Sequence, residues 1–242
     1  MSNESEFVSA VGSAVGSSRA VAVPAATFVP TARHIDGRDE CWSQVQAWAQ
    51  LEDHGKIVLH PLNQTLTVAL ERAQPLRGIE LTCFRGLAFP ERFVPASKDM
   101  GPPPEGSRVA TGRYNHDAQR VLYLSASIKG VAREVEQGPN DTWVQSYTLK
   151  LDGLRIADFR PPVETLLNHV FWWTETASED RGTRFLFSQF VAGRVAELFD
   201  GMIVPGVQGD ELTQYDNIVV FYPDDRWRSW LTEGSNPQRL GP

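Results

Sequence analysis

The sequence predicts an α+β fold in which a mixed or antiparallel sheet is flanked by helices. Helical and strand-like segments follow one another without the regular alternation that characterises parallel βαβ sheets. The segment 142–151 (TWVQSYTLKL) alternates apolar and polar residues, as a strand with one buried face does. The chain has 242 residues, 41% hydrophobic and 22% charged, which is enough for one sizeable core and a small extension.

Three regions are expected along the chain. Residues 1–38 are rich in Ser, Ala, Val and Gly with little apolar periodicity, which predicts a flexible leader. We place an N-terminal helical extension at 39–77 and the main, catalytic domain at 78–242.

The spacing of apolar residues predicts each element in turn. Asp39 suits the N-cap of a helix through 41–54, in which Trp42, Val45 and Trp48 recur at helical spacing. A second helix is expected at 62–73. In the main domain we expect strands at 79–86, 120–125, 142–151, 154–159, 201–206 and 217–223, and helices at 128–135, 163–173, 184–199 and 224–231.

Two arginines suit the binding of a phosphate. Arg85 ends the strand at 79–86 and precedes Gly86, which would let a ligand approach closely. Arg113 lies in the turn Gly112-Arg113-Tyr114-Asn115, which offers a guanidinium, an aromatic ring and an amide to a nucleotide. The alternatives are a surface arginine paired with a carboxylate and an ordinary turn.

Glu134 is the candidate for the reaction itself. A fixed carboxylate beside a ribose stabilises the positive charge that develops when an N-glycosidic bond breaks. Tyr123 ends the strand before the Glu134 helix and would stack on nicotinamide, and Ser188 would hydrogen-bond a phosphate or ribose. The alternatives are a solvated glutamate, a core tyrosine with its hydroxyl at the rim, and a serine at a helix N-terminus.

Composition argues against several other classes. The net charge of −7 disfavours nucleic acid as a direct partner, and no apolar run approaches the ~20 residues that span a bilayer. Neither HExxH nor CxxC occurs, so we expect no metal, and the two cysteines give no disulfide framework. Cys83 lies in the run IELTCF and should be a buried thiol. The N-terminus lacks the features of a secretory signal, and we expect a cytoplasmic protein.

The motifs taken in order resemble the RES family, which is named for arginine, glutamate and serine and comprises toxins of bacterial toxin–antitoxin pairs. The resemblance covers about residues 79–223 and is carried by Phe84-Arg85-Gly86, Thr111–His116, Tyr123-Leu124-Ser125, Val131-Ala132-Arg133-Glu134, Asp200–Pro205 and Asn217–Phe221.

This resemblance implies a fold related to ADP-ribosyltransferases and NAD+ as substrate, degraded by glycohydrolysis or by phosphorolysis. Arg85 and Arg113 would then hold the pyrophosphate, Tyr123 would line the nicotinamide or ribose side, and Glu134 would stabilise the oxocarbenium ion. It also implies a partner antitoxin, usually with an Xre-type helix-turn-helix domain. The N-terminal helices would offer a surface for a homodimer or for the antitoxin.

The chain departs from the family pattern at three positions. Gly206 stands where the family has serine, Thr111 replaces the first glycine of the turn, and Tyr114 replaces its tryptophan. Either Ser188 takes over the role of the missing serine, or activity is weakened or lost. Three hypotheses therefore stay open: an NAD-degrading toxin, an ADP-ribosyltransferase acting on a macromolecule, and a nucleotide- or partner-binding domain without turnover.

Overall fold

The computed structural model describes residues 40–105, 111–116, 119–135, 141–160, 162–175, 185–206, 215–221, 223 and 226–240. Their helices are α2 (Glu40–Ala49), α3 (His54–Leu59), α4 (Leu62–Arg72), α5 (Ile128–Glu134), α6 (Thr165–Glu175) and α7 (Leu186–Ala196), with 3-10 turns η2 (Ser97–Met100) and η3 (Trp227–Ser229). Their strands are β1 (Pro75–Leu76), β2 (Glu80–Phe89), β3 (Val121–Ser125), β4 (Asp141–Lys150), β5 (Ile156–Asp158), β6 (Gly201–Pro205), β7 (Asp216–Phe221), β8 (Leu231–Glu233) and β9 (Gln238–Arg239).

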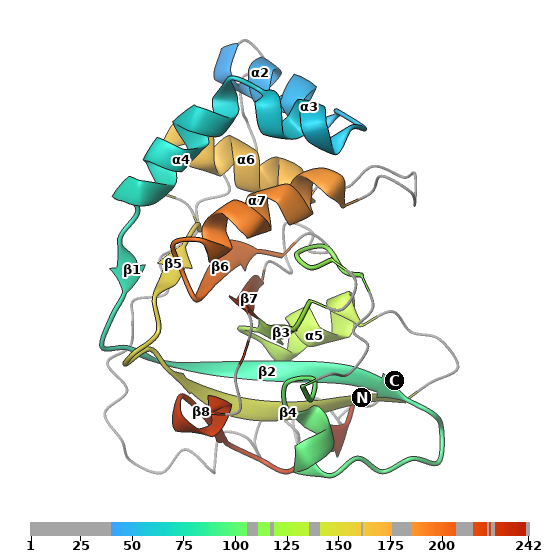
Figure 1. Cartoon of the computed structure of the whole chain (residues 1–242). Coiled ribbons are helices and arrows are strands. Elements are labelled where there is room, and N and C mark those ends of the chain that lie inside the picture. The colour runs from blue at the N-terminus through green and yellow to red at the C-terminus, as the bar shows by residue number, and fades with distance from the viewer. Residues whose placement is uncertain are drawn as a thin grey trace.

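The described strands form one mixed sheet in the order β1-β5-β6-β7-β3-β2-β4-β8, with β9 also paired to β4. The β5–β6 pairing is parallel and the other pairings are antiparallel. Helices flank this sheet, as Figure 1 shows. The predicted α+β class is therefore confirmed.

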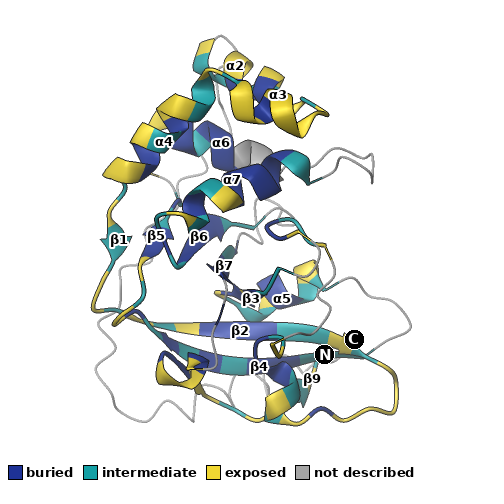
Figure 2. Cartoon of the chain, viewed as in Figure 1, coloured by how far each residue is buried: buried dark blue, intermediate teal, exposed yellow. Residues whose placement is uncertain are grey.

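Five helices gather at one end of the molecule, where α2, α3 and α4 lie against α6 and α7 (Figure 1). The sides of these helices that face one another are buried (Figure 2). Trp48 is fully buried, and its ring meets Phe187 and Phe190 edge-to-face at 5.1 and 5.6 Å between centroids. The helices of the predicted extension thus share an apolar core with α6 and α7.

The first predicted helix is divided in two. The pattern predicted one helix through residue 54, whereas α2 ends at Ala49 and α3 begins at His54. The cause is a new N-cap, because the side chain of Asp53 accepts a hydrogen bond from Lys56 N at 2.8 Å. The predicted leader 1–38 and the predicted cap Asp39 lie outside the described residues.

The predicted terminal helix at 224–231 is wrong. The described part of that segment has the single turn η3, followed by strand β8 on the edge of β4. Trp227 and Trp230 are buried, and Lys150 N donates to Trp230 O at 2.7 Å. The edge of β4 offers backbone groups that a strand satisfies and a helix would not, and this pairing outweighs the local helical pattern.

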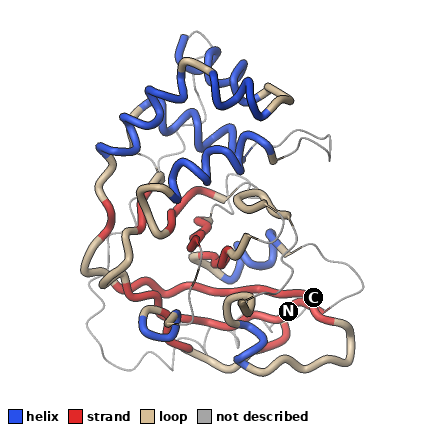
Figure 3. The backbone as a smooth tube through the Cα atoms, in the orientation of Figure 1, coloured by secondary structure: helices blue, strands red, loops and turns tan. Residues whose placement is uncertain are grey.

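One junction of the sheet is open. β2 and β3 share the single registered pair Phe84↔Ser125, although β2 pairs with β4 along all of its 10 residues. Helix α5 lies beside both strands (Figure 3). A Cβ at Gly86 would lie 2.1 Å from Val131 Cγ1. Gly86 therefore admits this helix, and the expectation that it also lets a ligand approach stays a prediction.

Candidate active site

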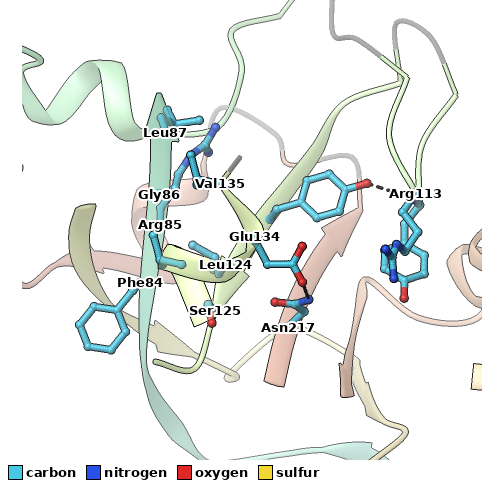
Figure 4. A pocket seen from close by; sticks show the side chains of 13 residues that line it. Phe84, Arg85, Gly86, Leu87, Arg113, Leu124, Ser125, Glu134, Val135 and Asn217 are labelled. Carbon is cyan, nitrogen blue, oxygen red and sulfur yellow. Dashed lines mark hydrogen bonds between the residues drawn. The ribbon is translucent and has the colours of Figure 1, made fainter. Parts of the chain in front are cut away.

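A pocket opens where β2 and β3 separate. Its volume of about 280 Å³ far exceeds the roughly 30 Å³ share of one water and lies near the lower end of ligand pockets. Figure 4 shows side chains from β2, β3, α5 and β7 around it. Among the predicted site residues, those that line it are Arg85, Arg113, Tyr114, Tyr123 and Glu134.

Arg85 supplies a buried positive charge. Arg85 is 8% exposed, and its Nη1 has no hydrogen-bond partner among the described residues. No described carboxylate forms an ion pair with it, so the alternative of a surface arginine paired with a carboxylate is wrong. Burial lowers the pKa of Arg85 from 12.5 to about 10. An anion in the pocket would give this guanidinium the partner that the described residues do not.

Glu134 supplies a fixed negative charge. It is the last residue of α5, whose N-cap is Ser127, as predicted: Ser127 Oγ accepts from Gly130 N at 3.0 Å. The Glu134 side chain is exposed, yet its Oε1 accepts from the hydroxyl of Tyr215 at 2.7 Å. The same oxygen accepts from Asn217 Nδ2, also at 2.7 Å (Figure 4). Among the described residues none donates to Oε2. This carboxylate is therefore held in place, unlike a freely solvated one.

Tyr123 presents its ring to the pocket and buries its hydroxyl, which is the reverse of the alternative, a core tyrosine with its hydroxyl at the rim. The residue is 38% exposed, but its hydroxyl donates to Asn115 Oδ1 at 2.8 Å and accepts from Tyr114 N at 3.0 Å. Burial of this hydroxyl raises the pKa of Tyr123. Asn115 is itself fully buried and lies behind the pocket wall, so it acts on the pocket through Tyr123.

The turn that carries Arg113 is fastened to α7. Gln189 Nε2 donates to Gly112 O and to Asn115 O, each at 2.9 Å. Its neighbour Ser188 is buried in the first turn of α7 and does not line the pocket. The structure therefore brings five of the predicted residues together and leaves Ser188 outside, while the roles of all of them stay predictions.

Sequence reasoning missed three residues that organise this site. Asn217 lay within a matched motif but received no role, and Gln189 was not singled out. Tyr215 gave no signal, because its partner Glu134 is 81 residues away and the contact exists only in the fold.

Comparison with known families agrees with this arrangement. The family model of the RES domain matches residues 84–229, which is more than half of the chain. The chain belongs to the RES family. The matched range includes every residue that lines the pocket, and RES domains are known from toxin–antitoxin-like systems. The described mixed sheet with flanking helices is consistent with the RES-domain fold. The search of curated proteins gave no match.

The described part of this RES protein has no cluster of three or more His, Cys, Asp and Glu side chains suited to a metal ion. None of the described helices is both long enough and apolar enough to cross a membrane.

Proposed function

We propose that this RES domain is an enzyme that consumes NAD+ by breaking the bond between nicotinamide and ribose, and that the chain is the toxin of a toxin–antitoxin pair. The observation that carries the proposal is the pairing of two opposite charges in one pocket. No anion among the described residues pairs with the guanidinium of Arg85, and the carboxylate of Glu134 is held by two donors.

The two charges match two parts of such a substrate, its pyrophosphate and its reacting ribose. A pyrophosphate is an anion that arginine binds through its planar fork, so Arg85 and Arg113 are assigned to it. The Tyr123 ring offers an apolar face to the nicotinamide. These contacts would place the reacting ribose beside Glu134.

In the proposed reaction, the bond between ribose C1 and the nicotinamide nitrogen breaks. Its electron pair leaves with the nicotinamide, which becomes neutral, and positive charge remains on the ribose. The Glu134 carboxylate stabilises that charge electrostatically. An oxygen of the acceptor then bonds to C1: water yields ADP-ribose and a proton, and inorganic phosphate yields ADP-ribose phosphorylated at C1.

A transfer to a macromolecule would use the same bond cleavage with a different acceptor. NAD+ that carries a radiolabel in its ADP-ribose part separates these outcomes. A transferase leaves that label on protein or nucleic acid, whereas a glycohydrolase or phosphorylase releases it as a small molecule. We also propose that an antitoxin, expected to carry an Xre-type helix-turn-helix domain, neutralises the enzyme by binding this chain.

The proposal is tested by inducing the chain in growing bacteria and measuring NAD+ in extracts. We expect NAD+ to fall before growth stops, and Glu134→Gln to abolish both effects. The matched control is Glu233→Gln, since Glu233 is exposed on β8 and lies outside the pocket; it should act as the parent protein does. Growth arrest with NAD+ intact, or equal NAD+ loss with Glu134→Gln, would overturn the proposal.

A further inference from the structure

We infer that Tyr215 is the positioning residue for Glu134: with Asn217 it fixes one carboxylate oxygen and leaves the other for the substrate. The inference rests on the proposed function, in which Glu134 acts on the ribose. Its physical basis is the 2.7 Å hydrogen bond from the Tyr215 hydroxyl to Glu134 Oε1.

The Tyr215 ring is held in a slot that two glycines create. A Cβ at Gly206, just after β6, would lie 2.0 Å from Tyr215 Cε2, and a Cβ at Gly130 in α5 would lie 2.6 Å from Tyr215 Cδ2. Atoms that close cannot coexist, so each position must lack a side chain while the ring is there. Tyr215 is 5% exposed, and the ring has little freedom to move its hydroxyl away from Glu134.

The backbone of Tyr215 and of the residue that follows it is also anchored. Gly206 N donates to Tyr215 O at 2.7 Å, and Ala126 N donates to Asp216 O at 2.8 Å. The carboxylate of Asp216 pairs with Arg160 Nη1 at 2.9 Å. These bonds tie Tyr215 to the segment that enters α5, the helix that carries Glu134. The tyrosine and its acceptor therefore belong to one rigid arrangement.

This slot explains why residue 206 is a glycine. Glycine at that position raised the possibility of lost activity in the sequence, since a serine was expected there. In the structure a serine would collide with the Tyr215 ring, whose own hydroxyl reaches Glu134. Gly206 is therefore the complement of Tyr215, which gives this glycine a reason other than decay of the site.

These two hydrogen bonds also determine how the Glu134 carboxylate is oriented in the pocket. Both donors converge on Oε1, and none of the described residues occupies Oε2. With Oε1 fixed, rotation of the carboxylate is restricted, so Oε2 keeps one direction relative to the pocket. A charge held still in this way does not need to reorganise as the ribose becomes positive.

The test is the kinetics of NAD+ cleavage by Tyr215→Phe, which keeps the ring and removes the hydroxyl. A hydrogen bond to a charged group contributes about 1.5–3 kcal/mol, so kcat should fall about tenfold to a hundredfold. KM should stay within about twofold, because Tyr215 positions Glu134 and does not bind the substrate. A tyrosine that only stabilised the fold would not lower kcat while leaving KM nearly unchanged when its hydroxyl is removed.

A second variant, Gly206→Ser, displaces the ring and should lower kcat to a similar extent. The double variant Tyr215→Phe, Gly206→Ser should lose much less than the product of the two single losses, since both act on one hydrogen bond. The control is Gly193→Ser in α7, where an added Cβ meets nothing within 4 Å, and its kcat should be unchanged.

The outcomes separate this inference from the proposed function. If the parent protein cleaves NAD+ and Glu134→Gln does not, but Tyr215→Phe keeps the parental kcat, the inference fails and the function stands. If the parent protein leaves NAD+ intact, the proposed function fails, and the Tyr215–Glu134 hydrogen bond is then tested by urea unfolding of Tyr215→Phe, Glu134→Gln and the double variant. If the decrease in the unfolding midpoint of the double variant equals the sum of the two single decreases, the inference is overturned. A decrease smaller than that sum would support it.

Discussion

Replacing Arg85 by methionine should make the protein more stable and inactive. The change removes a buried charge and keeps an unbranched side chain of similar reach. Because Nη1 has no partner among the described residues, Arg85 bears the cost of an unsatisfied buried donor, which is about 1–3 kcal/mol. Methionine carries no such donor and loses no bond that the described residues make to this guanidinium.

The pKa of Arg85 gives an independent magnitude for the same cost. Burial lowers this pKa from 12.5 to about 10. At ~1.36 kcal/mol per unit, the charged form is disfavoured in the folded protein by about 3 kcal/mol relative to the unfolded chain. The penalty is fully present at neutral pH, because it is relieved only as pH rises through the folded pKa. The two figures describe one effect and do not add, so Arg85→Met should raise the free energy of unfolding by about 1–3 kcal/mol.

The assay is urea unfolding at pH 7 in a buffer without phosphate. Arg155→Met is the matched control, since Arg155 forms an exposed surface pair with Asp200, and its change should stay within about 0.5 kcal/mol. Added pyrophosphate should raise the unfolding midpoint of the parent protein and leave that of Arg85→Met unchanged. Destabilisation of Arg85→Met by more than about 1 kcal/mol would refute the reasoning, because it would mean that the folded protein satisfies this guanidinium.

Three other predictions concern the surroundings of the pocket. Gln189→Leu removes the donor to two backbone oxygens of the turn that carries Arg113, so KM for NAD+ should rise about tenfold and stability should fall by about 1–3 kcal/mol; parental values for both would contradict this. Gly86→Ala places a Cβ 2.1 Å from Val131 Cγ1 and should cost about 1–3 kcal/mol in urea unfolding, whereas a change below about 0.5 kcal/mol would show that α5 shifts freely. Burial raises the pKa of Cys83 from 9.0 to about 12, so the unfolded chain loses this proton first, and stability should fall as pH rises between those values. From pH 8 to 10 the parent protein should lose about 1 kcal/mol more than Cys83→Ala, and equal losses would contradict the burial of this thiol.

Local patterns predicted the parts of the fold that depend on local chemistry. Ser127 caps α5 as expected, because its hydroxyl meets a backbone donor three residues on. Cys83 is buried as the run around it indicated. The prediction of a terminal helix was wrong because pairing with β4 determines the backbone conformation of that segment. The periodicity of the segment carries no information about a distant sheet edge. Long-range partners are the part of the structure that local spacing does not encode.

The same division applies to the site. Arg85, Arg113, Tyr123 and Glu134 were found from their residue types and places on elements, and the structure brings all four to one pocket. The residues that hold these side chains in place were not predicted from the sequence. Tyr215 reaches Glu134 only because β7 lies beside β3 in the sheet. The burial of the Tyr123 hydroxyl was not predicted either, because its partners lie in a turn several residues earlier in the chain.

The central claim is that this pocket cleaves NAD+ through Glu134. Proton NMR of NAD+ with the purified protein tests it most directly, with and without inorganic phosphate and beside Glu134→Gln. The account predicts that free nicotinamide appears with the parent protein and not with Glu134→Gln, and dependence on phosphate would identify the acceptor. Intact NAD+ in both buffers, or equal nicotinamide release by Glu134→Gln, would contradict it.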